Sequence, residues 1–206
     1  FNLFFDRIRG KECGVTAILK YPLRLLSVQQ VQRVSNILAS AELIRRENLP
    51  CGDEFALGYF VGEHNTPNKM KKVRETVAGM SPMELDEKYR LLDVCPYCGE
   101  NSIHVVFDED KDSLVHVCDT DGCASKGIIP LYMVDDDVYR YLPCVIISTV
   151  DKMTAIGSNS RFHNILCGTD FKCPKHGYTD KLRCLADNCY CDAADFEKVE
   201  LKDPAP

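Results

Sequence analysis

Four cysteines in the middle of the chain constrain its fold more than any other feature. Cys95 and Cys98 lie in the segment Cys-Pro-Tyr-Cys-Gly, and Cys118 and Cys123 form a second pair roughly twenty residues later. Zinc binds four such thiolates in a tetrahedron, and one tight turn can supply two of them. Between the pairs, residues 102–107 and 113–117 alternate around a polar turn, which predicts a hairpin. We therefore expect a zinc ribbon.

A second set of metal-ligating side chains lies near the end of the chain. The expected ligands are Cys173, His176, Cys184 and Cys189, with Cys191 as an alternative to Cys189. Zinc accepts a neutral imidazole in place of one thiolate. Because each set offers four protein ligands, neither leaves an open position for water, and both predicted zinc sites are structural rather than catalytic.

Composition narrows the choice of compartment and partner. The 206 residues are 45% hydrophobic, enough for a packed core, and carry a net charge of −6. Any contact with nucleic acid must therefore use a local basic patch. No apolar run approaches the roughly twenty residues of a membrane span. Several of the twelve cysteines lie in close pairs, which favours metal binding in a reducing cytoplasm over a disulfide framework.

Hydrophobic periodicity outside the cysteine segments predicts an α/β fold. Apolar, β-branched runs indicate strands at residues 14–21, 55–61, 127–134 and 142–148. Spacings of three and four predict a helix over residues 27–46, with Ser27 as its N-cap. Further helix starts are expected after residues 66–68, at residues 81–84 and at residues 135–141, the last being a short helix or turn.

Asp135, Asp136 and Asp137 follow an apolar strand, as the acids of a magnesium site often do. However, the chain contains no Gly-x-x-x-x-Gly-Lys-Ser/Thr loop to hold a phosphate. We interpret the acidic run as a solvated turn.

The first ten residues begin within a helical pattern, with neither an initiator Met nor an N-cap, so we expect a segment of a longer protein.

Two strand ends carry residues suited to a phosphate. Pro22 and Arg24 follow the first strand, and Thr149 to Lys152 follow the last. In open parallel sheets, ligands bind at the carboxyl ends of the strands, where helix N–H groups, a hydroxyl or an arginine can hold a phosphate. The alternative is ordinary helix capping by Thr149 or Asp151 with a solvated Arg24.

The order of short segments along the chain resembles superfamily-two helicases, and especially the large helicase-like subunit of DISARM phage-defence systems. The matching segments are residues 21–26 with Gln29, Gln30, Gln32 and Arg33, Val61-Gly62, Thr66 to Asn68, Cys95 to Gly99, Thr149 to Lys152, and Ile165 to Gly168 with Cys167 in place of Phe. The resemblance implies part of a RecA-like motor domain, with motif Ia after residue 21 and motif Ib after residue 148. It also implies that the ATP- and magnesium-binding motifs belong to the parent protein outside this segment.

The resemblance further implies which residues face a DNA strand. By position in motifs Ia and Ib and the segment between them, these are Pro22, Arg24, Thr66, Asn68, Thr149 and Lys152. Other defence-system subunits are implied as partners.

We expect the chain to be divided into a RecA-like core at residues 1–92 and 127–168, a zinc ribbon at 93–126 and a second zinc module at 169–206. Both zinc inserts are expected to project away from the sheet. The alternative function is a stand-alone zinc-stabilised binding module without a motor.

Overall fold

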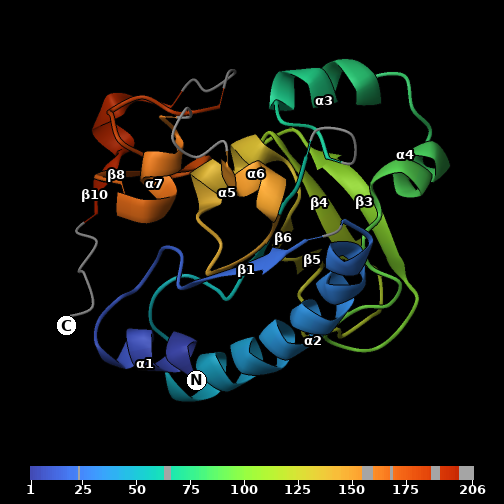
Figure 1. The fold of residues 1–206 in the computed structure, drawn as a ribbon, viewed down its shortest axis with the longest axis horizontal. Helices are drawn as coiled ribbons and strands as arrows, with labels where there is room; N and C mark the ends of the chain where they lie inside the picture. The colour runs from blue at the N-terminus through green and yellow to red at the C-terminus, as the bar shows by residue number, and fades with distance from the viewer. Residues whose placement is uncertain (23, 63–65, 155–159, 168, 187–190, 200–206) are drawn as a thin grey trace.

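A four-stranded parallel sheet forms the centre of the molecule (Figure 1). The computed structural model describes residues 1–22, 24–62, 66–154, 160–167, 169–186 and 191–199, without the side chains of residues 24–26 and 167. The strands are β1 (Ala17–Tyr21), β7 (Val145–Thr149), β2 (Leu57–Phe60) and β6 (Leu131–Tyr132), in that spatial order. All three pairings are parallel, so the predicted α/β core with a parallel sheet is confirmed.

Helices cover both faces of this sheet (Figure 1). On one face, Val31 and Leu38 of α2 (Arg24–Asn48) share a core with Ile147 of β7. On the other, α5 (Asp135–Tyr141) and α7 (Phe162–Cys167) pack with Phe60 and Ile146. Successive side chains of a strand point to opposite faces, and this explains why two neighbours in β7 enter different cores. Burying one such side chain stabilises the fold by about 1.5–3 kcal/mol.

The long helix α2 begins earlier than the sequence predicts. Ser27 lies inside the helix and is fully buried, so its interpretation as the N-cap was wrong. Its hydroxyl lies 3.0 Å from the Tyr59 hydroxyl of β2. The polar side chain therefore joins the helix to the sheet. At its other end α2 lies near α1 (Asn2–Ile8), whose Phe4 ring packs against the Phe55 ring in a T-shaped arrangement.

The predicted hairpin is confirmed as β3 (Ile103–Asp108) and β4 (Ser113–Cys118), paired antiparallel. The expected strand over residues 127–134 is divided at Pro130. β5 (Ile128–Ile129) pairs with β4, whereas β6 joins the central sheet. Two helices, α3 (Met70–Val77) and α4 (Pro82–Tyr89), precede the hairpin. The Ser81–Glu84 capping box at the start of α4 is formed as the sequence predicts.

The first cysteine cluster does not bud away from the sheet, which corrects the expectation from sequence. Cys95, Cys118 and Ile103 belong to the same buried core as α2, β2 and β7. Apolar side chains flank the ligands, so the segment gains stability by packing onto α2 as well as by any metal it holds. The cysteine segment is thus a part of the main core.

The chain after β7 forms a small second layer. It contains α6 (Val150–Thr154), α7, β8 (Phe171–Cys173), β9 (Gly177–Thr179), the 3-10 turn η2 (Ala193–Asp195) and β10 (Glu197–Lys198). β8 lies between β10 and β9, with both pairings antiparallel. The last seven residues of the chain, 200–206, lie outside the described residues.

The acidic run of α5 is not a solvated turn, contrary to the sequence interpretation. Asp135, Asp136 and Asp137 are all buried in the first turn of α5, where negative charge is favourable to the helix dipole. Each carboxylate holds a different part of the fold. The partners are Lys152 for Asp135, the Met70 N–H group and Arg161 for Asp136, and Ser113 with Arg140 for Asp137. Each of these acids is therefore paired with a cation inside the fold.

No helix in the described part of the chain has both the length and the apolar character needed to cross a bilayer.

Candidate functional site

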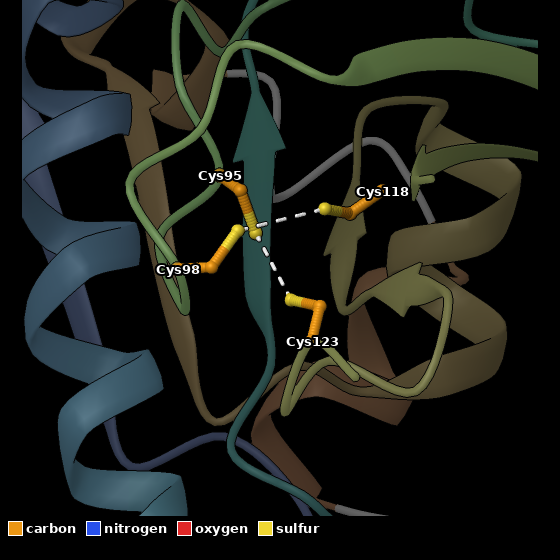
Figure 2. A group of neighbouring side chains, drawn as sticks. All are labelled: Cys95, Cys98, Cys118 and Cys123. Atoms are coloured by element: carbon orange, nitrogen blue, oxygen red, sulfur yellow. Dashed lines mark hydrogen bonds between the residues drawn. The ribbon is translucent and has the colours of Figure 1, made fainter. Parts of the chain in front are cut away.

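Four cysteine thiols converge beside the central sheet (Figure 2). Cys95 and Cys98 come from the turn before β3, Cys118 from the end of β4, and Cys123 from the loop that follows. Their sulfur atoms all lie within 4.8 Å of one another. The sequence-predicted set is therefore brought together in full by the fold.

The spacing of these sulfur atoms fits a metal ion and excludes disulfides. The Cys95–Cys123 and Cys98–Cys118 sulfur atoms are 3.7 Å and 3.8 Å apart. A tetrahedron with metal–sulfur bonds of about 2.3 Å, the value for zinc, has edges of about 3.8 Å. A disulfide would need about 2.05 Å. The cluster can hold a metal ion and is compatible with zinc.

Hydrogen bonds from the loop after β4 favour the thiolate form of Cys123. Burial raises the pKa of this thiol, but hydrogen bonds from the Ser125 hydroxyl and N–H group and from nearby cysteines outweigh it and lower the pKa to about 7. The Ser125 hydroxyl lies 3.2 Å from the sulfur. Donors around a ligand atom orient it and stabilise its charged form.

Helix α2 holds this cluster from both sides. The Gln32 amide donates to the Val94 carbonyl at 3.0 Å and accepts from the Asp93 and Val94 N–H groups at 2.9 and 3.2 Å. Further along the helix, Arg46 donates to the Ala124 carbonyl at 2.7 Å. These contacts lie directly before Cys95 and directly after Cys123. The helix therefore fixes both segments that carry the ligands.

Arg46 is itself held by a buried acid. Glu42 is fully buried and accepts from Arg45 at 2.7 and 2.8 Å, from Arg46 at 2.9 Å and from the Phe55 N–H group at 2.9 Å. Burial raises the pKa of Glu42, but these hydrogen bonds outweigh it and hold the pKa below its ordinary value. A buried charge with every lone pair engaged is tolerated, whereas an unpaired one is costly.

The second cluster contains Cys173, His176 and Cys191. The Nδ1 atom of His176 lies 3.6 Å from the Cys173 sulfur and 3.7 Å from that of Cys191. A zinc ion bound to one nitrogen and one sulfur places these atoms about 3.6 Å apart. Cys184 is a hydrogen-bond partner of Cys173, so it lies beside the cluster. Cys189 lies outside the described residues, and the structure brings in Cys191, the predicted alternative.

The two predicted strand ends lie side by side at one edge of the central sheet. β1 and β7 are adjacent and parallel, and Tyr21 is the register partner of Thr149. β2 is the other neighbour of β7, with Phe60 opposite Ser148. The expectation that the chain leaves the sheet at one rim after residues 21 and 147 is confirmed. We call this edge the strand-end rim.

The residues expected to face a DNA strand differ in their exposure at this rim. Pro22 is exposed, and the side chain of Arg24 lies outside the described residues. Thr149 is fully buried, and its hydroxyl has no hydrogen-bond partner in the described part of the chain. Thr66 is buried and its hydroxyl donates to the Val61 carbonyl at 3.4 Å.

Lys152 and Asn68 are bonded to each other. The Lys152 ammonium donates to the Asn68 side-chain oxygen at 3.0 Å and to the Asp135 carboxylate at 2.5 Å. It also lies 4.7 Å from the centre of the Phe60 ring, close enough for a cation–π interaction. Burial raises the pKa of Asp135 to about 6, although Lys152 acts in the opposite direction.

The sequence did not reveal the structural roles of three residues that organise these sites: Gln32, Arg46 and Asp135. The two helix residues are ordinary polar positions in the sequence, and only their partners distant in the chain give them a role. Asp135 had a visible signal, because it directly follows an apolar strand and so reaches the carboxyl edge of the sheet.

Fold and sites together define a mixed α/β protein with a parallel sheet, helices on both faces and two thiol-rich clusters that can hold metal ions. No protein-family model matches the chain. The chain is similar to the DISARM protein DrmA of Bacillus paralicheniformis, with 30% identity over 180 residues. The match covers 82% of this chain and 16% of the relative, so the chain spans about a sixth of that protein's length.

Proposed function

We propose that this chain is the nucleic-acid-facing part of a DISARM-type anti-phage defence protein of the superfamily-two helicase class. In this proposal the central sheet belongs to a RecA-like motor domain, whose ATP and magnesium motifs lie elsewhere in the parent protein. The strand-end rim grips the sugar–phosphate backbone of DNA, and other defence subunits assemble with the parent. Similarity to a DISARM protein over most of the chain supports this reading.

The observation that carries the proposal is the register of β1 and β7. Tyr21 and Thr149, far apart in sequence, end adjacent parallel strands at the same edge. Segments that resemble motifs Ia and Ib therefore start from neighbouring points, as two contacts on one strand require. Backbone contacts of this kind position a strand without reading its sequence.

We also propose that zinc occupies both cysteine clusters in structural roles. Four thiolates around the first ion leave no open coordination position for water or substrate. The packing of Cys95 and Cys118 into the core of the sheet supports a structural role.

Binding of a fluorescein-labelled single-stranded oligonucleotide, measured by anisotropy between 50 and 250 mM KCl, tests the rim. Arg24→Ala is expected to weaken binding and to reduce the salt slope by about 0.7, the value for one lost contact with a single-strand phosphate. Lys198→Ala is the matched control, because Lys198 lies beside residues 10–13 and 52–53, which precede β1 and β2 at the opposite edge. Equal behaviour of the two variants would refute the assignment of the rim.

A further inference from the structure

The surroundings of the Lys152 ammonium leave little of it accessible to a ligand. Its ammonium has three N–H groups, of which one bonds Asp135 and one bonds Asn68, while the ammonium also contacts the face of Phe60. The side chain is only 13% exposed and that of Asp135 only 7%. A phosphate could reach this ammonium only by breaking a largely buried ion pair, which is strongly unfavourable.

The same contact fixes the orientation of the Asn68 amide. An ammonium group only donates, so the Asn68 atom that faces Lys152 must be the carbonyl oxygen. The amide NH2 group consequently points away from Lys152. In the described part of the chain this NH2 group has no hydrogen-bond partner, and Asn68 is partly exposed at the rim. The next residue, Lys69, has a side chain that is 60% exposed, and its ammonium lies 3.9 Å from the Asp136 carboxylate, a long contact that leaves most of the ammonium in solvent.

Asp135 completes the arrangement. Its carboxylate accepts from the Lys152 ammonium and supplies the opposite charge that this largely buried cation needs. Asp135 comes from the first turn of α5, Lys152 from α6 and Asn68 from the segment before α3. Residues from three elements therefore fix the orientation of the Asn68 side-chain amide.

We propose that Lys152 is a positioning residue that, with Asp135, presents the Asn68 NH2 group at the strand-end rim as a donor to a phosphodiester oxygen of the bound strand. This inference rests on the proposed function and deepens it. It assigns the strand contact to Asn68 and exposed cations such as Lys69. It removes from Lys152 the direct phosphate contact that its position in the sequence implies.

The salt dependence of oligonucleotide binding separates positioning from direct contact. Asn68→Ala and Lys152→Ala are each expected to weaken binding of labelled dT15 by about 10- to 150-fold, the range for a hydrogen bond to a charged group. The double variant should lose no more than either single variant, because both remove one interaction. Lys69→Ala should instead lower the salt slope by about 0.7.

Lys152→Ala leaves the Asp135 carboxylate without its cation, so a variant that keeps the net charge is needed as a control. In Asp135→Asn with Lys152→Gln the rim keeps its net charge, and residue 152 can still donate to Asn68. Binding within about twofold of wild type, with an unchanged salt slope, is expected. A slope lower by about 0.7 in this variant, or full additivity of the Asn68 and Lys152 losses, would overturn the positioning role.

A direct view of Asn68 comes from the ¹⁵N–¹H spectrum of the 206-residue chain. The side-chain NH2 signal that disappears in Asn68→Ala should shift on addition of dT15. A stationary signal on a protein that binds dT15 overturns this inference alone. Absence of any dT15 binding at 50 mM KCl overturns the proposed function together with it.

Discussion

Replacing Gln32 by alanine should loosen the first metal cluster without touching a ligand. The Gln32 side chain makes three hydrogen bonds to the backbone of Asp93 and Val94, the two residues before Cys95. Alanine retains the helix and removes all three bonds. The turn that carries Cys95 and Cys98 then loses its attachment to α2.

The size of the effect follows from these contacts. Each hydrogen bond contributes about 0.5–1.5 kcal/mol net. Since Asp93 is exposed, water can replace part of the loss, and about 2 kcal/mol is expected in total. With a urea dependence of about 2 kcal/mol per molar, the unfolding midpoint should fall by roughly 1 M.

Two measurements check this prediction. Urea unfolding of the zinc-loaded protein gives the midpoint, and zinc transfer to a coloured chelator gives the rate at which the cluster opens. An opening cost lowered by one to two kcal/mol corresponds to release about five- to thirtyfold faster. Gln29→Ala is the matched control, because Gln29 is an exposed glutamine on the same helix and shares the same change in helix propensity.

Equal midpoints and equal release rates for the two glutamine variants would refute the reasoning. A lower midpoint with an unchanged release rate would show that α2 stabilises the fold independently of the metal cluster.

Two further predictions concern the metals and the buried acid. Metal analysis should find two zinc ions per wild-type chain, one per chain in Cys118→Ser, and two in the control Cys51→Ser. Less than one equivalent in the wild type would contradict the zinc assignment. Glu42→Gln should lower the free energy of unfolding by about 1.5–3 kcal/mol at pH 7, because Arg45 loses its charged partner, while exposed Glu47→Gln should change it by less than 0.5 kcal/mol. The folded-state pKa of Glu42 is lowered, so its carboxylate stabilises the fold above about pH 4.5. The difference between wild type and Glu42→Gln should therefore shrink as the pH falls below that value, and a constant difference in urea unfolding down to pH 3.5 would be evidence against the buried ion pair.

The sequence by itself determined the local features of this protein. Close cysteine pairs identified the first cluster in full, since the ligand spacing within each turn is a local property. Apolar runs located the strands of the sheet, and the Ser81–Glu84 pattern located the start of α4. Because parallel strands end at a common edge, the order of segments also predicted that the strand ends after residues 21 and 147 would lie side by side.

Only the tertiary structure decided which polar groups are buried and what they hold. Asp135 is hydrophilic in sequence, yet the fold places it against Lys152 and so turns an apparent surface turn into part of a buried network. Gln32 acquires its role from Val94, sixty-two positions away. Sequence patterns report periodicity along the chain, whereas the partner of a buried charge depends on contacts between distant elements, which no local pattern contains.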